Sequence, residues 1–154
     1  AREVLDILYE ESKKSLAAGK RKEILTVTNH ADGPYIYMKA KQEDPELAEK
    51  MLEKLKRNGG NRSGIAIANI DSFGNVYPDQ FSRFMKLGSL RESSFQDIWS
   101  GKNKDLEKLR DRKLYLNRRC KECSWLDICN GNLRARAYNT SGDFWAEDPG
   151  CYLD

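Results

Sequence analysis

The sequence predicts an α/β protein in two parts: a strand–helix–strand unit in residues 1–70, followed by a small irregular α+β module in residues 71–154. Two observations predict this division. Short runs of β-branched and aliphatic residues flank an amphipathic helical segment in the first part. All four cysteines lie in the last 35 residues. Hydrophobic periodicity is weak there, and a small core of this kind needs a metal or covalent cross-links to be stable.

The first elements follow from residue spacing and from helix-breaking residues. Apolar residues at helical spacing predict a helix from Val4 to about Leu16, which Gly19 ends. Residues 23–28 are rich in β-branched side chains and predict a buried strand. Residues 35–40 alternate aromatic and aliphatic residues, which predicts a second strand or a continuation along the sheet edge.

A second helix and a further strand complete the first part. Asp44 is the expected N-cap, Pro45 lies in the first turn, and apolar residues then recur at intervals of three and four. Residues 58–60, Asn-Gly-Gly, end this helix. Residues 65–70 predict another buried strand, so the whole segment is expected to form a βαβ-type unit.

The second part begins with a predicted hairpin in residues 71–78, which has a Gly-Asn tip. Ser93, followed three residues later by Gln96, is a capping-box pattern that predicts a short helix. A charged helix is expected over residues 103–116. No regular element is predicted beyond it, which leaves the tail dependent on its cysteines.

Composition and charge narrow the class of protein. The chain carries 27 basic and 24 acidic side chains, a formal net charge of +3, so nucleic acid is not the expected partner. It has no apolar run near the roughly 20 residues of a membrane span and no visible secretory signal, so we expect a cytoplasmic protein with no membrane partner. Because the chain begins with Ala1 inside a predicted helix, we expect it to be a piece of a longer protein.

The cysteines follow the pattern C-x2-C-x5-C-x21-C, formed by Cys120, Cys123, Cys129 and Cys151. A two-residue gap lets two thiolates face one metal centre from a tight turn, and the later cysteines complete the coordination. Three hypotheses are open: two disulfides, which need an oxidising compartment; a structural zinc, which prefers two CxxC pairs; and a four-iron cluster, which accepts irregular spacing. The spacing favours the cluster.

Basic residues gather around these cysteines. They would attract a negatively charged cofactor or substrate, and a solvated basic face is the alternative. The residues are Arg118, Arg119, Lys121, Arg134 and Arg136.

Several short motifs accompany the cysteines and are more specific than their spacing. They are Gly74-Asn75-Val76-Tyr77-Pro78, Leu87-Gly88, Ser94-Phe95-Gln96-Asp97-Ile98-Trp99, Cys120-x2-Cys123-x5-Cys129, Arg134-Ala135-Arg136-Ala137, Gly142-Asp143, Asp148-Pro149 and Cys151. This string resembles the SPASM domain, the C-terminal auxiliary-cluster module of radical S-adenosylmethionine enzymes.

The chain departs from the complete SPASM pattern at two positions. Leu133 stands where a further cysteine is expected four residues after Cys129, and Asp79 stands where another is expected after Pro78. The resemblance therefore implies a single auxiliary 4Fe-4S cluster, bound by the four cysteines present. A single-cluster module with this Asp-Gln sequence resembles the branch that modifies siroheme-derived tetrapyrroles, of the heme d1 biosynthesis type or the didecarboxysiroheme deacetylase type.

Earlier residues agree with the same branch. Residues 29–33, 58–64 and 69–71 resemble the last strands of that family's partial (β/α) barrel. The resemblance thus implies that residues 1–70 are the C-terminal part of a radical S-adenosylmethionine barrel. It implies that residues 71–154 are the auxiliary-cluster domain.

The resemblance also implies a function for the longer protein. A second 4Fe-4S cluster, in that protein only, would reductively cleave S-adenosylmethionine, and the resulting radical would attack a side chain of the tetrapyrrole substrate. An electron donor would be a further partner. The CxxxCxxC motif of that cluster is absent from this sequence, so the fragment alone is expected to be inactive. The auxiliary cluster would accept an electron from the substrate radical or shape the pocket.

Five residues are candidates for substrate binding. Asn29, His30 and Asp32 follow a predicted strand at the end where barrel enzymes place active-site loops, and a structural role for His30 is the alternative. Arg134 and Arg136 are forked donors that suit tetrapyrrole carboxylates or would tune the cluster. No catalytic residue is predicted.

A second class of function stays open, a non-catalytic zinc- or iron–sulfur-binding module that acts as a scaffold or electron relay. Metal analysis and a visible spectrum would separate iron–sulfur from zinc. The sheet edges and helix faces of an incomplete barrel also lead us to expect self-association of this chain.

Overall fold

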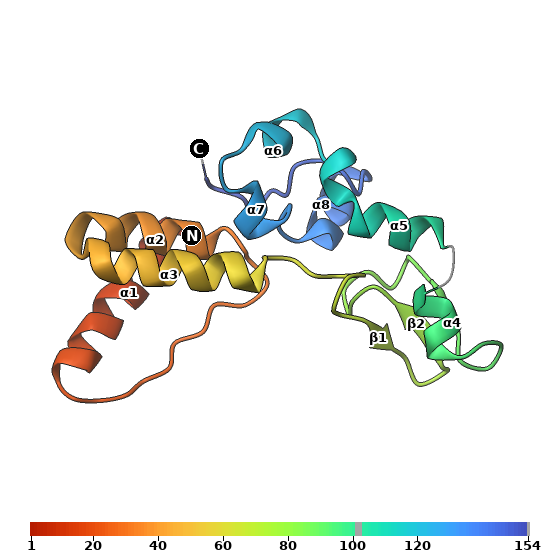
Figure 1. Cartoon of the computed structure of the whole chain (residues 1–154), viewed down its shortest axis with the longest axis horizontal. Coiled ribbons are helices and arrows are strands. Elements are labelled where there is room, and N and C mark those ends of the chain that lie inside the picture. The colour runs from red at the N-terminus through yellow and green to blue at the C-terminus, as the bar shows by residue number, and fades with distance from the viewer. Residues whose placement is uncertain (101–102, 154) are drawn as a thin grey trace.

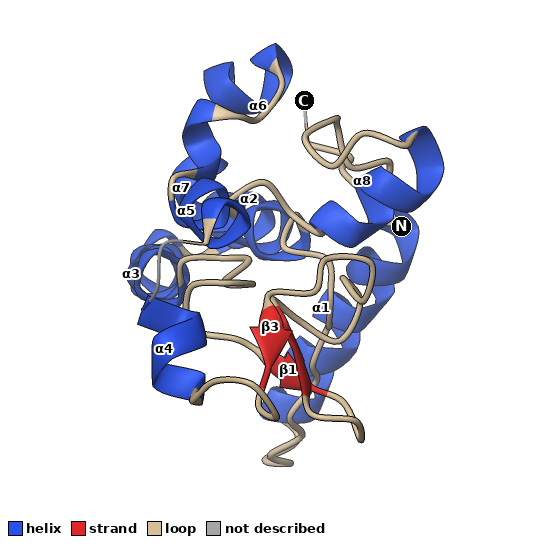
Figure 2. Cartoon of the chain, turned by 90° about the vertical axis from the view of Figure 1, so that its right-hand side faces the viewer, coloured by secondary structure: helices blue, strands red, loops and turns tan. Residues whose placement is uncertain are grey.

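The computed structural model describes residues 1–100 and 103–153. Within them the regular structure is mainly helical, with one small antiparallel sheet (Figures 1 and 2). The elements are α1 (Arg2–Ala17), α2 (Asp32–Glu43), α3 (Pro45–Asn58), β1 (Asn69–Ile70), β2 (Asn75–Tyr77), β3 (Gly88–Ser89), α4 (Phe95–Ser100), α5 (Lys104–Arg110), the 3-10 helix η1 (Arg112–Leu114), α6 (Arg118–Glu122), α7 (Leu126–Cys129) and α8 (Arg134–Ser141). Figure 1 shows α1–α3 at one end of the molecule, the sheet and α4 at the other, and α6–α8 between them.

Helices α2 and α3 form a hairpin that packs on α1 (Figure 1). Asp44 separates them and caps α3, because its side chain accepts a hydrogen bond of 2.9 Å from the backbone N–H of Leu47. Gly59 ends α3 in the left-handed conformation. The helices predicted from Val4 and after Asp44 are therefore confirmed. The buried core of this part consists of Tyr9, Tyr37, Ala40 and Ala48.

Two strands predicted in the first part are wrong. Residues 23–28 form no strand, and Leu25 and Val27 are 72% and 74% exposed. A β-branched run becomes a strand only when another strand pairs with it, and no described segment pairs with this one. Residues 35–40 lie inside α2 instead. Its buried residues Pro34, Tyr37 and Ala40 recur every three positions, which is the period of a helix face and not of a strand.

The third predicted strand, residues 65–70, is mostly turn. The backbone N–H groups of Ile65, Ala66 and Ile67 all donate to the carbonyl of Arg62, which coils this segment, and only Asn69–Ile70 enters β1. The strand–helix–strand unit is therefore absent from the described residues, and the α/β class is replaced by helices with a small sheet. That composition is compatible with a small α+β module.

The predicted hairpin is confirmed. β1, β2 and β3 form an antiparallel sheet in that order, with Ile70 opposite Val76. Asp71 shapes the first turn, because its carboxylate accepts the N–H groups of Phe73 and Asn75, each at 2.9 Å. A second core joins β2 to helices α4 and α5 and consists of Val76, Leu87, Ile98 and Leu106.

The two helices predicted after the hairpin are confirmed with shifted ends. α4 is capped by Ser94, whose hydroxyl accepts the N–H of Asp97 at 3.1 Å, and not by the predicted Ser93. Asn103 caps α5, which stops at Arg110 and is followed by η1. In the described part of the chain, no helix combines the length and the apolar character that crossing a membrane requires.

Candidate metal centre

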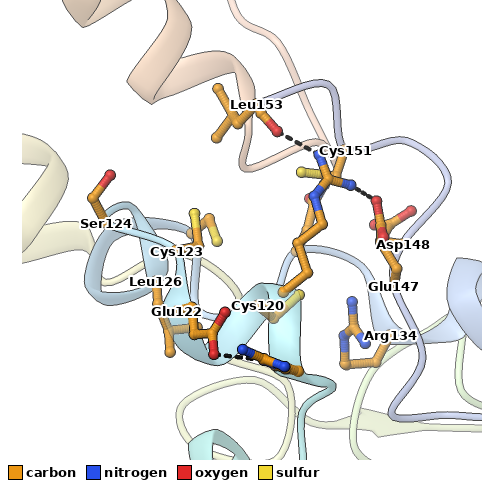
Figure 3. Close-up of a pocket in the computed structure, with 15 residues that line it drawn as sticks. Cys120, Glu122, Cys123, Ser124, Leu126, Arg134, Glu147, Asp148, Cys151 and Leu153 are labelled. Carbon is orange, nitrogen blue, oxygen red and sulfur yellow. Dashed lines mark hydrogen bonds and ion pairs between the residues drawn. The ribbon is translucent and has the colours of Figure 1, made fainter.

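Cys120 and Cys123 are placed by helix α6. Asn117 is its N-cap, since the side-chain oxygen accepts the backbone N–H of Cys120 at 3.0 Å. Cys123 follows the last residue of α6, and its Sγ accepts the backbone N–H of Trp125 at 3.4 Å. The short helix turns both cysteine side chains toward the same space (Figure 3).

Cys129 is the last residue of α7 and is fixed from the first part of the chain. Its carbonyl accepts the backbone N–H of Asn61 at 3.1 Å. Gly60 lies so close that a Cβ there would sit 2.3 Å from the carbonyl oxygen of Ile128 and 2.4 Å from that of Cys129. The Gly-Gly pair that ends α3 therefore also permits the segment before Asn61 to press against the cysteine loop.

Cys151 is held through Asp148. The backbone N–H of Cys151 donates to the Asp148 carbonyl at 2.8 Å. The Asp148 carboxylate is 1% exposed and accepts the N–H of Leu133 at 2.8 Å, the N–H of Gly150 at 2.8 Å, and a forked pair from Arg136 at 2.6 and 2.9 Å. This one carboxylate ties the tail that carries Cys151 to the start of α8.

All four cysteines line one cavity of about 630 Å³. Figure 3 shows Cys120, Cys123 and Cys151 on different sides of it. Each cysteine is a free thiol. The other lining residues include the basic Arg118, Arg119 and Arg134 and the acidic Glu122, Glu147 and Asp148.

Two of the cysteines, Cys120 and Cys129, have raised pKa values in the metal-free chain. Burial raises the pKa of Cys129 to about 11, against a smaller opposing effect of the Gly131 backbone N–H. Burial also raises the pKa of Cys120, while the positive charge of Arg134 acts in the other direction. A metal must therefore displace protons when it binds to these thiols.

The cavity is wider than a single-ion site. Among the described residues, no three His, Cys, Asp or Glu side chains converge tightly enough to hold one metal ion. Four sulfur ligands spread around one cavity suit a cofactor with several metal atoms, such as an iron–sulfur cluster. Arg134 fits as well, since its Nε and Nη2 are buried and have no hydrogen-bond partner among these residues.

The basic residues near the cysteines differ in their surroundings. The Arg118 side chain is 88% exposed and pairs with Glu122 at 2.7 Å. Arg119 pairs with Glu147 and donates to the Leu153 carbonyl at 2.6 Å. Arg136 is committed to Asp148, and Lys121 is exposed outside the cavity. Arg118 and Arg119 are therefore the basic groups at the open rim.

The three N-terminal candidates lie beside the cysteine loop and not in the cavity lining. The N–H of His30 donates to the Asn132 side chain at 2.7 Å, which in turn donates to Asn29 at 2.7 Å. Asp32 accepts from Asn29 at 2.9 Å and from the Tyr152 hydroxyl. Burial lowers the pKa of His30, and the charge of Arg112 adds to this effect, so its imidazole is neutral.

Sequence reasoning missed three residues that build this region. Asn132 has φ +57°, and the run Asn130-Gly131-Asn132 was a visible signal of left-handed backbone. Asn61 accepts from the Ser63 N–H at 3.0 Å and from the buried Arg112 at 2.8 Å. No local signal reveals the pairing of Asn61 with Arg112, because these two residues stand far apart in the sequence.

Residues 64–124 match the model of the SPASM family, described as an iron–sulfur cluster-binding domain. The predicted resemblance to the SPASM domain is confirmed by this match, and the predicted resemblance to proteins of the tetrapyrrole pathways agrees with the names of the relatives.

Among the relatives, the chain is 43% identical to an Fe-coproporphyrin III synthase of Methanosarcina barkeri, over 99% of this chain and 39% of that protein. It is 39% identical to a pre-heme d1 synthase of Dinoroseobacter shibae, over 99% and 38%. An AdoMet-dependent heme synthase of Methanosarcina barkeri is 32% identical over 73% of this chain and 31% of its own length. The chain thus spans about two fifths of the length of the first two. No solved structure gives a significant match.

Proposed function

We propose that the longer protein is a radical S-adenosylmethionine enzyme that modifies a siroheme-derived tetrapyrrole in heme or heme d1 biosynthesis, and that this chain is its C-terminal part. Residues 1–70 would be the end of a partial barrel and residues 71–154 the auxiliary-cluster domain. One observation carries the proposal: four cysteines line one cavity in a chain similar to two named tetrapyrrole synthases. We place the protein in the cytoplasm, because cluster ligands must stay reduced.

Cys120, Cys123, Cys129 and Cys151 would hold one 4Fe-4S cluster, which supplies one-electron transfer when bound. Zinc is the alternative. A zinc ion needs its four sulfurs at about 2.3 Å from one point, whereas the described thiols surround a wide cavity and form no single-ion group. This spread supports the cluster.

Backbone groups of the chain prepare the thiolates for such a cofactor. The N–H of Trp125 points at Cys123 Sγ, and the N–H of Gly131 at the Cys129 sulfur. Hydrogen bonds to a thiolate stabilise its negative charge, and they tune a metal centre that it binds. The part of this chain would be to hold and enclose the centre beside the substrate.

A single cluster is supported by what replaces the two missing cysteines. Asp79 is buried and accepts the N–H groups of Phe81 and Ser82 at 2.8 and 2.7 Å, and a hydrogen bond from the Ser63 hydroxyl. Leu133 offers no ligand, and its N–H donates to Asp148. Both positions thus serve the protein framework.

The substrate would approach the open rim of the cavity. Arg118 and Arg119 present partly exposed guanidinium groups there, which suit propionate or acetate carboxylates. Asn29, His30, Asp32, Arg134 and Arg136 all bond within the chain, so substrate contact by them stays a prediction. An electron donor is a further proposed partner.

The proposal is tested by measuring iron, zinc and acid-labile sulfide in the anaerobically reconstituted chain. We expect about four irons and four sulfides per chain with broad visible absorption. One zinc per chain without sulfide would favour the alternative function, a non-catalytic scaffold.

The longer protein then tests catalysis, which we expect to require an upstream CxxxCxxC motif. Loss of activity when those cysteines become serine would support the enzyme, and a longer protein without the motif would refute it.

The exposed segment of residues 23–28 supports the barrel proposal. It is rich in β-branched residues, forms neither helix nor strand, and has no strand partner among the described residues. Exposed Ile7, Leu25 and Val27 add apolar surface on the same part of the chain. We therefore expect the chain to self-associate. Light scattering at increasing concentration measures this, and a monomer at high concentration would contradict it.

A further inference from the structure

Arg134 is the most unusual buried side chain of the cysteine region. It is the first residue of α8 and is 1% exposed. Its Nη1 donates to the carbonyls of Phe144 and Ala146. Its Nε and Nη2 are buried and meet no hydrogen-bond acceptor among the described residues. A buried polar group without a partner is destabilising, and a charged one more so, so these two donors require an acceptor.

Arg112 shows how a buried arginine is normally satisfied in this chain. It is also 1% exposed, but all three of its nitrogens find oxygens. Nε donates to the Leu109 carbonyl at 2.8 Å, Nη1 to the Asn61 side chain at 2.8 Å, and Nη2 to the Ser63 carbonyl. The orphaned donors of Arg134 are thus not a general feature of buried arginines in this protein.

The orphaned donors of Arg134 belong to the cysteine cavity. Arg134 lines that cavity, and Figure 3 shows its guanidinium beside the Cys120 side chain. No carboxylate among the described residues forms an ion pair with it, since Arg136 engages both Asp148 oxygens. Burial lowers the pKa of Arg134, whereas a negative charge on Cys120 raises this pKa more than any other group does.

We propose that Arg134 is a positioning residue of the metal centre: it donates from Nε or Nη2 to a sulfur at the Cys120 corner of the cluster and so stabilises the reduced state. This inference rests on the proposed function, because it needs the cluster. Four thiolates around an oxidised four-iron core carry a net charge near −2, and reduction adds one more negative charge. A buried positive donor therefore favours the reduced form and raises the reduction potential.

The test uses the whole 154-residue chain, reconstituted anaerobically with iron and sulfide. Redox titrations followed by electron paramagnetic resonance compare the wild type, Arg134→Gln and Arg134→Lys. Lys121→Gln is the matched control, because it removes one positive charge from an exposed position between two of the cysteines.

Arg134→Gln should favour the oxidised cluster about tenfold at a given potential, which corresponds to a midpoint about 59 mV more negative for a one-electron couple. Arg134→Lys should keep part of the effect, and Lys121→Gln should change the midpoint much less. A fully iron-loaded Arg134→Gln with the midpoint of Lys121→Gln would overturn the inference, since a purely structural role would not move the potential.

If the Arg134 variants lose iron, their midpoint potentials do not report on Arg134, and a measurement on the wild type then tests the inference. With ¹⁵N-labelled arginine, the reduced cluster should show hyperfine coupling to a guanidinium nitrogen, and its absence would overturn the inference. A wild-type chain that binds no cluster would refute the proposed function and this inference together. A loaded wild type without the Arg134 effect would refute the inference alone.

Discussion

The Oδ1 atom of Asp148 lies 2.6 Å from Nε of Arg136, and this pair joins the tail that carries Cys151 to helix α8. The carboxylate is 1% exposed and the arginine side chain 31%. Breaking a buried pair leaves one partner without its counter-charge. The pair therefore links the stability of the chain to the geometry of its candidate metal centre.

Asp148→Asn should lower the free energy of unfolding by about 3 kcal/mol and reduce the iron bound per chain. Denaturant unfolding and iron analysis measure both effects. Glu11→Gln is the control, because it breaks an exposed ion pair with Lys14, and exposed pairs contribute little to stability. Equal losses in the two variants would contradict the role of Asp148 in holding the Cys151 tail.

The two neighbouring glycines at the end of α3 should respond differently to alanine. Both have positive φ, +71° at Gly59 and +66° at Gly60, so each substitution costs about 1 kcal/mol for left-handed backbone. A Cβ at Gly59 meets nothing within 4 Å, whereas one at Gly60 would collide with the Ile128–Cys129 backbone. Gly60→Ala should therefore cost about 3 kcal/mol in total and lower the iron content.

Gly59→Ala is the built-in control for this prediction, since it has the same backbone strain without the collision. Unfolding free energies and iron content are measured on both variants under identical conditions. If Gly59→Ala proved as damaging as Gly60→Ala, the close approach to Cys129 would not matter.

The depressed pKa of Asp71 makes the stability of the chain sensitive to acid. Hydrogen bonds from Asn75, Tyr77 and Phe73 hold the pKa of its carboxyl at about 2, below the ordinary value of 3.8. A carboxyl whose folded pKa is depressed adds stability above its unfolded pKa, and that stability is lost as the pH falls from about 4 toward 2. Asp71→Asn should therefore be less stable than the wild type at pH 5, with a difference that shrinks below pH 4.

Thermal unfolding of wild type and Asp71→Asn between pH 5 and pH 2 measures this difference. Any loss of metal at low pH affects both proteins, so the difference between them reports on Asp71. A gap in stability that stayed constant down to pH 2 would show that the turn does not depend on the charge of Asp71.

Metal loading should release protons from the cysteines. The raised pKa values of Cys120 and Cys129 keep both thiols protonated at pH 7, and only thiolates bind metal. Affinity for metal should therefore fall as the pH is lowered. Calorimetric titrations in buffers of different ionisation enthalpy count the protons. Release of fewer than two protons per chain at pH 7 would show that at least one of these two thiols is already ionised in the metal-free protein.

Sequence patterns predicted the elements whose signals are local. Asp44 and Gly59 mark the ends of α3 through cap chemistry, and Asp71 marks the hairpin. Sequence patterns failed where the secondary structure of a segment depends on its contacts with other segments. Residues 23–28 have strand composition but no strand to pair with among the described residues. Residues 35–40 alternate aromatic and aliphatic residues as a strand does, although the spacing of the buried Tyr37 and Ala40 is helical.

The candidate site could be predicted to a similar extent. The cysteine spacing predicted that Cys120, Cys123, Cys129 and Cys151 share one site, and the structure brings them to one cavity. Their role as ligands stays a prediction. The hydrogen bonds that hold the walls of that cavity in place were not predictable. They join positions far apart in the sequence, such as Asn61 with Cys129 or His30 with Asn132.

X-ray absorption at the iron and zinc edges of the anaerobically reconstituted chain tests the central claim most directly. If the four cysteines hold one iron–sulfur cluster, the iron edge should show a sulfur shell and a second shell of neighbouring iron atoms. Both shells should be lost when Cys129 is replaced by serine. A zinc edge with four sulfur neighbours and no metal–metal shell would contradict the claim.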